Sequence, residues 1–237
     1  MFEPSAFCFS TPPPTPPPPK GGRGDVERTE TISRLPFRPL AEEGSGVGLK
    51  GGAFIAGSSW PADEAVFFPV FQKPAFQNWK LIIAPHEPSE ENVRRICGQV
   101  ENAVRYSQIL PPKPRGRNDT RCLVIDNVGL LNTLYRYCTV AYIGGGFGKG
   151  IHNTLEPAAF GLPIIFGPKY EKFEEARQFV ARGGAFPVHD SEELAAVLEK
   201  LQDPDFYEKA SRAVRGYLEE SKGATGKVVA FLENLTA

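Results

Sequence analysis

The sequence lacks the two features that would assign a nucleic-acid-binding or a membrane-spanning protein at once. Its 237 residues carry 27 Lys and Arg against 28 Asp and Glu, a net charge of −1. A chain without excess positive charge has no bulk basic surface for nucleic acid. No apolar run reaches the roughly 18 residues that a membrane helix needs. We therefore expect no nucleic-acid partner and no transmembrane segment in this chain.

Cysteine and histidine are also scarce, and their spacing forms no metal or disulfide pattern. Only three histidines are present, and none of the four cysteines belongs to a C-x-x-C pair. Zinc sites and disulfide frameworks both need closely patterned ligands. We therefore predict no metal, no cofactor and a reducing compartment, the cytoplasm. The four cysteines are Cys8, Cys97, Cys122 and Cys138.

The first 50 residues differ in composition from the rest of the chain. Ten of the 23 prolines lie in the first 40 residues, and the run PPPTPPPP spans Pro12–Pro19. Such a run favours polyproline II, and the Gly-rich stretches after it favour disorder. We predict a disordered leader at 1–50, with no signal peptide, and a folded domain at 51–237. The proline run is either an SH3-type ligand or a linker, and its unspecific flanks favour the linker.

From residue 51 onward, short apolar runs typical of buried strands alternate with helical patterns. The strand-like runs are 54–59, 80–85, 121–126, 140–145, 162–167 and 185–188. Helices are predicted after Ser89, with Val93, Ile96, Val100 and Val104 on one face, at 130–137, 152–160, 171–184 and 192–201 capped by Ser191, and from Asp205 and Lys227. This alternation predicts an α/β fold, a Rossmann-like parallel sheet with helices on both faces.

In such sheets ligands bind beyond the carboxyl ends of the strands, so the loops at that edge are the candidate binding loops. They are 57–60, 85–87, 126–129, 144–150 and 167–170. The segment GGGFGKGIHNTLEPAAFG, Gly144–Gly161, is the strongest of them, with five glycines in seven residues before a helix. Glycines let backbone N–H groups approach a ligand, and a helix N-terminus favours an anion.

Two familiar phosphate motifs do not fit this glycine loop. A P-loop with Lys149 as its lysine would need glycine at Ile143 and a hydroxyl residue at Gly150. A dinucleotide fingerprint starting at Gly144 would need glycine at Lys149. The loop therefore suits an anion without naming it, and a purely structural glycine turn remains the alternative.

Two polar residues of the following helix extend this interpretation. Asn153 can cap the helix, and the Glu156 carboxylate can accept hydrogen bonds from two ribose hydroxyls. In this interpretation the start of the helix binds the phosphate of a nucleotide, and Glu156 binds its sugar. The alternative is a surface glutamate that the helix dipole stabilises.

The same segment closely resembles the donor-binding motif of 3-deoxy-D-manno-octulosonic acid (Kdo) transferases, which are GT-B glycosyltransferases. The segment AGSSWPADE at 56–64 is similar to the family's G-S-T-W-x-x-E, and IIAPHE at 82–87 to its P-R-H-x-E element. The resemblance covers about residues 54–236. The matching loop residues are Gly144, Gly145, His152, Asn153, Leu155, Glu156, Pro157, Gly161, Pro163, Gly167 and Pro168.

The resemblance implies transfer of Kdo from CMP-Kdo to a lipid A precursor in lipopolysaccharide biosynthesis, with inversion and without a catalytic metal. The family has two Rossmann-like domains, and its catalytic glutamate lies in an H-G-x-S-x-G-E motif of the N-terminal, acceptor-binding one. This sequence has no such motif, so we expect the donor-binding half of a GT-B fold, inactive alone and with no catalytic residue of its own. The acceptor and the cytoplasmic face of the inner membrane would be reached through the missing half.

Each predicted site residue receives a role from the resemblance. The phosphate would lie against Gly57, Ser58, Ser59, Gly145, Gly146, Lys149, His152 and Asn153, and the ribose against Glu156. Cytosine would lie between Pro85, His86 and the loop 126–129 with Asn127 and Gly129, and the Kdo carboxylate near Lys169 and Tyr170. The alternatives are a turn histidine for His86, a solvated side chain for Lys149 and a plain loop before a helix at 169–170. Phe173, Ala176 and Phe179 are expected in the core.

Two other functions remain open at this stage. One is another GT-B nucleotide-sugar enzyme, a UDP-sugar transferase or an epimerase. Those enzymes usually show a second glutamate about eight residues after the first, and 161–164 contains no carboxylate. The other is an inactive fragment that only binds nucleotide.

Overall fold

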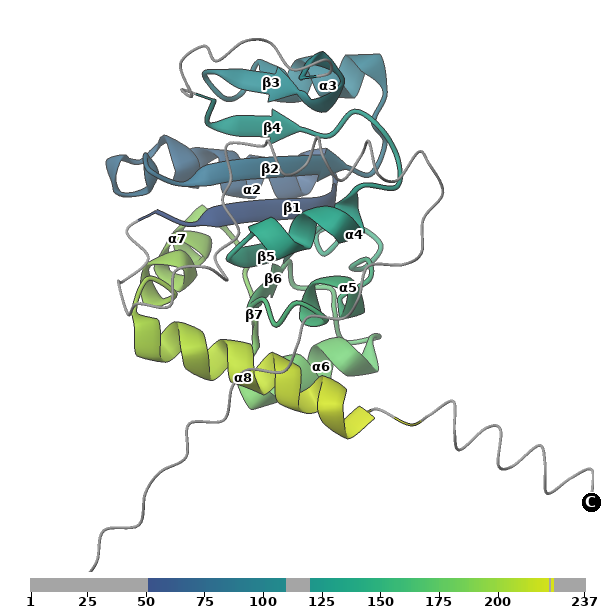
Figure 1. The fold of residues 1–237 in the computed structure, drawn as a ribbon, viewed down its shortest axis with the longest axis vertical. Coiled ribbons are helices and arrows are strands. Elements are labelled where there is room, and N and C mark those ends of the chain that lie inside the picture. The colour runs from purple at the N-terminus through teal and green to yellow at the C-terminus, as the bar shows by residue number, and fades with distance from the viewer. Residues whose placement is uncertain (1–50, 110–119, 222, 224–237) are drawn as a thin grey trace, which may run out of the picture. The chain divides into compact units, whose positions relative to one another are not determined.

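A seven-stranded parallel sheet forms the centre of the fold in the computed structural model, which describes residues 51–109, 120–221 and 223 (Figure 1). The predicted leader at 1–50, Cys8 and the helix predicted from Lys227 lie outside the described residues, and the 50/51 boundary stays a prediction. The strands are β1 Ala53–Ser59, β2 Lys80–Pro85, β3 Ala103–Arg105, β4 Cys122–Val124, β5 Val140–Ile143, β6 Ile164–Phe166 and β7 Ala185–Pro187.

The order of the strands, β3-β4-β2-β1-β5-β6-β7, places a switch point between β1 and β5. From β1 the chain adds β2, then β3 at the edge of the sheet, and β4 fits between them. It then crosses to β5 on the other side of β1 and adds β6 and β7 outward. Each adjacent pair runs parallel, with Phe54 opposite Leu81 on one side and Val140 on the other. In open α/β sheets ligands bind in the crevice at such a point.

Helices cover both faces of the sheet, as predicted (Figure 1). Successive side chains of each strand point to opposite faces, so both faces carry apolar side chains that need cover. Phe54 and Ala56 of β1 belong to a core cluster with side chains of α2, α3 and α7. On the other face, a Cβ added at Gly57 would meet Leu131 and Tyr135. The helices are α2 Pro61–Gln72, α3 Glu90–Cys97, α4 Leu131–Leu134, α5 Leu155–Ala158, α6 Glu174–Arg182, α7 Ser191–Lys200 and α8 Pro204–Ser221.

One α-helix and one strand of the described residues were not predicted from the sequence. Helix α2 contains Pro69, which removes a backbone donor, but this residue is exposed while Phe67, Phe68 and Phe71 are buried. Strand β3 has only three half-buried residues at the sheet edge. The prediction that Val104 continues the face of α3 is wrong, because the helix ends at Cys97 and Val104 lies in β3.

The predicted helix caps and core side chains agree with the structure in part. Ser89 caps α3 as predicted, since its side chain accepts a hydrogen bond from the Asn92 N–H. Helix α7 is capped by Asp190 rather than Ser191, because the Asp190 carboxylate accepts from two backbone N–H groups. Ala176 and Phe179 are buried as predicted, whereas Phe173 is only half-buried.

No helix of the described ranges has the length and apolar character needed to cross a membrane.

Candidate functional site

The loops that follow β1 and β5 touch each other at the switch point. The Gly144 N–H donates to the Gly57 carbonyl at 2.9 Å. A Cβ at Gly144 would lie 2.2 Å from the Ser58 carbonyl oxygen, so only glycine fits there. Ser58 itself has a left-handed backbone with a φ of 53°. The two loops therefore form one closely packed unit at the carboxyl edge of the sheet.

A cavity of about 140 Å³ opens beside this unit. It brings together five of the predicted site residues, from the end of β1 and from the segment around the start of α5. Three further side chains, from α4 and β5 and the 3₁₀ turn after α4, complete its wall and were not predicted. The lining residues are Gly57, Ser58, Leu131, Tyr135, Ile143, His152, Asn153 and Glu156.

Two glycines of the predicted anion loop have structural roles. Gly145 has a φ of 94°, and its N–H donates to the Asp63 carboxylate at 2.9 Å. That amide is therefore already engaged. A Cβ at Gly146 would lie 2.5 Å from the Gly167 nitrogen, so Gly146 packs against the loop after β6. These contacts give both glycines a structural role, and their contact with a donor stays a prediction.

Asp63 of α2 is the buried anchor of this arrangement, and its role was not predicted. Its carboxylate accepts from the Gly145 N–H, from the Trp60 N–H at 3.0 Å and from the Tyr142 hydroxyl at 3.0 Å. Burial raises the pKa of the Asp63 carboxyl, while these hydrogen bonds act in the opposite direction. The sequence W-P-A-D contains a usable signal, since Pro at the first helical position and Asp at the third mark a helix start.

The neighbouring carboxylate, Glu64, binds the last residue of β1, Ser59. Ser59 Oγ donates to Glu64 Oε1 at 3.1 Å, and Arg95 Nη1 of α3 lies 2.6 Å from Glu64 Oε2. Both Ser59 and Glu64 are buried. The Ser59 hydroxyl is therefore directed to Glu64.

Three aromatic rings form a cluster beside the crevice, and one of them, His152, lines the cavity. Trp60 stacks on His86 with ring centroids 4.4 Å apart, and His86 stacks on His152 at 4.5 Å. Trp60 Nε1 donates to His152 Nε2 at 3.2 Å. Burial lowers the pKa of His152, nearby His86 lowers it further and Asp63 raises it. This cluster joins the ends of β1 and β2 to the glycine loop.

Helix α5 is shorter than predicted, since it begins at Leu155 rather than His152. The N-cap position belongs to Thr154, and its side chain makes no capping hydrogen bond. Asn153 still supports the helix start, because its Oδ1 accepts from the Leu155 N–H at 2.9 Å. Its Nδ2 donates to Glu156 Oε1 at 3.1 Å, which orients the carboxylate beside the cavity.

The remaining predicted residues lie around the crevice rather than in its wall. Pro85 is the last residue of β2, next to β1, and His86 follows it. Asn127 and Gly129 are exposed in the loop after β4, one strand farther out. Lys149 is exposed on the glycine loop.

Lys169 and Tyr170, predicted near the Kdo carboxylate, lie in the loop after β6. Lys169 Nζ donates to the Gly148 carbonyl at 2.8 Å and so joins this loop to the glycine loop. The Tyr170 ring lies 5.0 Å from that of Phe166.

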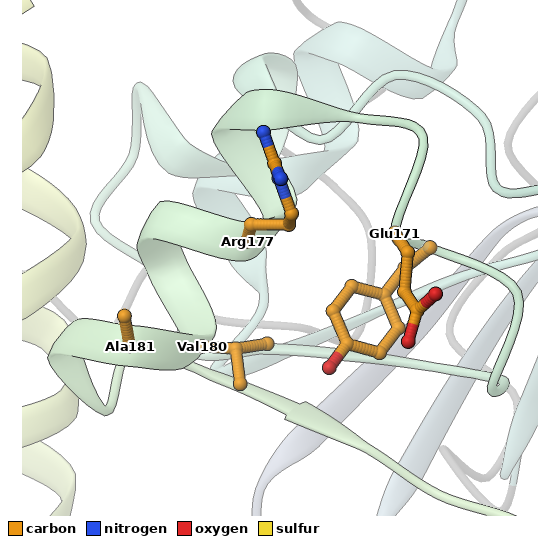
Figure 2. Close-up of a pocket in the computed structure, with 5 residues that line it drawn as sticks. Glu171, Arg177, Val180 and Ala181 are labelled. Atoms are coloured by element: carbon orange, nitrogen blue, oxygen red, sulfur yellow. The ribbon is translucent and has the colours of Figure 1, made fainter.

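A second hollow, of about 490 Å³, is larger but lies on helix α6 (Figure 2). Arg177, Val180 and Ala181 come from the helix, and Glu171 faces them from the preceding loop. Arg177 is paired with Glu174. Because the hollow contains Tyr170 but none of the residues that gather at the switch point, we assign the candidate site to the smaller crevice.

In the part of the chain that the structure describes, no group of three His, Cys, Asp or Glu side chains could hold a metal ion.

Comparisons with known proteins point to one family. A 3-deoxy-D-manno-octulosonic acid transferase of Aquifex aeolicus is 29% identical over 212 residues, covering 82% of this chain and 55% of the relative. One of Rickettsia bellii is 30% identical over 172 residues, covering 69% of this chain and 38% of the relative. The resemblance predicted from the sequence is thus confirmed. No protein-family model matches the sequence.

A solved structure shows the same fold. The C-terminal CMP-Kdo binding domain of WaaA from Acinetobacter baumannii superposes with a TM-score of 0.65 at 18% identity, covering 83% of this chain and 99% of that chain. This match confirms the Rossmann-like half of a GT-B fold. The chain spans about half or less of the length of the relatives named above.

Proposed function

We propose that this chain, a relative of the Kdo transferases, is a donor-binding half that holds CMP-Kdo for transfer of Kdo to a lipid A precursor. The observation that carries the proposal is the cavity at the switch point. Five residues that the family motif assigns to the donor line it together, although Gly57 and Ser58 lie about 100 positions before His152, Asn153 and Glu156. The two relatives from Aquifex aeolicus and Rickettsia bellii are named Kdo transferases.

The phosphate of the donor lies, in this proposal, between the turn at Ser58 and the segment His152–Asn153. Both border the cavity, and Ser58 has a left-handed backbone near the end of β1. As the bond to Kdo breaks, negative charge grows on the CMP phosphate. Dipoles that are already in place stabilise that charge without reorganisation.

Glu156 binds the ribose in this proposal. A carboxylate has about four acceptor positions, and Asn153 uses only one of them. The remaining positions suit two neighbouring hydroxyl groups. An anionic side chain beside a phosphate site is otherwise unfavourable, which assigns Glu156 to the sugar rather than to the phosphate.

The acceptor hydroxyl is deprotonated, in this proposal, by a base of an acceptor-binding half. The lipid acceptor and the inner-membrane location belong to that half as well. Of the alternatives, the names of the relatives favour CMP-Kdo over a UDP-sugar.

Calorimetric titration of the full chain with CMP, and with UDP as the matched control, tests this proposal. We expect CMP to bind at least tenfold more tightly than UDP, a difference of about 1.4 kcal/mol. Circular dichroism before the titration verifies that the protein is folded. Equal or tighter binding of UDP would contradict the proposal, as would a folded protein that binds neither nucleotide.

A further inference from the structure

The hydrogen bond between Trp60 and His152 determines which ring nitrogen of His152 carries the proton. Trp60 Nε1 carries a hydrogen and can only donate, so His152 Nε2 must accept. A neutral imidazole has one donor and one acceptor nitrogen. The contact therefore assigns the proton of the neutral His152 ring to Nδ1.

The surroundings hold this arrangement from several elements. The carboxylate of Asp63 accepts the backbone N–H of Trp60, which fixes the residue that carries the indole. The His86 ring stacks on both Trp60 and His152. His152 itself lines the cavity together with Asn153 and Glu156. His152 thus borders the candidate phosphate site, and one of its two ring nitrogens accepts the hydrogen bond from Trp60.

We propose that Trp60 is a positioning residue that locks His152 in its neutral Nδ1–H tautomer, and that this N–H donates to the phosphate of the bound nucleotide. The contact with the nucleotide rests on the proposed function, whereas the tautomer of His152 rests on the hydrogen bond from Trp60 alone. Without the indole, the ring would share its proton between both nitrogens and present an acceptor to the phosphate part of the time. An acceptor facing an anion is repelled.

The titratable groups around His152 are Asp63 from α2 and His86 after β2, together with Tyr135 and Glu156, which line the same cavity. Burial and His86 lower the pKa of His152, so the neutral ring prevails at pH 7. The indole hydrogen bond also favours the neutral form, because a protonated ring cannot accept it. Removing the indole N–H must therefore raise the pKa of His152.

Nitrogen-15 NMR of the full chain without ligand tests the tautomer. The chain has three histidines, and the His152→Gln variant identifies the signals of His152. We expect the Nδ1–H pattern in the natural chain. In Trp60→Phe, which keeps an aromatic ring but lacks the donor, we expect a mixture of tautomers and a higher pKa of His152.

The chain offers Trp79 as the matched control. It is buried in the core, and its substitution by Phe should leave the His152 signals unchanged. An Nε2–H pattern in the natural chain overturns the inference, even if Trp60→Phe fails to fold. A tautomer ratio and pKa that are the same in Trp60→Phe overturn it too.

Titration with CMP then separates the inference from the proposed function. We expect Trp60→Phe to bind CMP at least threefold more weakly than the natural chain, and Trp79→Phe to bind it equally. Equal affinity of Trp60→Phe and the natural chain overturns the inference and leaves the proposed function in place. An Nδ1–H ring in a folded chain that does not bind CMP overturns the proposed function and the phosphate contact, while the tautomer lock stands.

Discussion

The crevice at the switch point and the loop after β4 lie at the same edge of the sheet but are built differently. At the crevice, Asp63 is fully buried, and Gly144 packs against Ser58. In the loop after β4, Val128 is 84% exposed, and a Cβ added at Gly129 would meet nothing within 4 Å. Both regions were predicted to contact the nucleotide.

This difference separates two kinds of binding element. The crevice has polar groups fixed in advance by buried hydrogen bonds, so little ordering cost remains when an anion binds. The loop after β4 is tied down at Asp126, whose carboxylate accepts from the Ser107 N–H at 3.0 Å, while Asn127 is exposed. We therefore expect the crevice to bind the phosphate and ribose, which need fixed polar partners, and the loop after β4 to contribute less to binding.

Substituting Gly144 by Ala is expected to have the largest effect. The new Cβ would collide with the backbone of Ser58, which no side-chain rotation can relieve. We expect the free energy of unfolding to fall by about 3 kcal/mol or more, measured by urea denaturation. The crevice would lose CMP binding with it.

Gly129→Ala is the control for this substitution. Its φ of 94° strains any residue with a Cβ, but the space around it is open. We expect a loss of about 1 kcal/mol. A loss as large as that of Gly144→Ala would show that the two loops are equally constrained.

Removing the Asp63 carboxylate comes next. Asp63→Ala leaves the N–H groups of Gly145 and Trp60 and the Tyr142 hydroxyl without their acceptor in a buried place. We expect the free energy of unfolding to fall by about 2 kcal/mol in thermal or urea denaturation.

The corresponding change in the other loop is Asp126→Ala. Its partner Ser107 is exposed and can bond to water instead, so we expect a loss below about 0.5 kcal/mol. Equal losses for the two aspartates would remove the distinction between a fixed crevice and an open loop.

Glu156→Ala and Asn127→Ala are expected to change ligand binding rather than stability. Loss of the ribose contact should weaken CMP binding at least tenfold, about 1.4 kcal/mol, in calorimetric titration. Asn127→Ala should weaken it only about twofold to threefold, because the residue is exposed and lies beyond β2. Unchanged CMP affinity in Glu156→Ala would refute the ribose assignment.

The sequence predicted the sheet better than its covering layers. Six of the seven strands, β3 being the exception, coincide with apolar runs bounded by turn residues, which is a local property. Helix α2 was missed because Pro69 interrupts its pattern, and α5 was drawn too long because an Asn before apolar residues resembles a cap. In both cases tertiary packing decides what the local pattern leaves open.

The same limit applies to the site. The residues of the family motif, among them His152 and Glu156, were found because they are contiguous in the sequence. Asp63 and Tyr135 were missed as site residues because their partners lie far away in the chain. The hydrogen bond from Gly145 to Asp63 joins positions 82 residues apart, a relation that periodicity and spacing do not carry.

That separation also has a consequence for the order in which the protein is made. Ribosomes add about 5–20 residues per second, so roughly 4–16 s separate the synthesis of Asp63 from that of Gly145. During most of this interval the carboxylate lacks two partners, Tyr142 of β5 and Gly145 in the loop after β5. Contacts between distant positions also form late because long loops must close first. The crevice is thus completed on the nascent chain only after β1 and its neighbour β2 can pair.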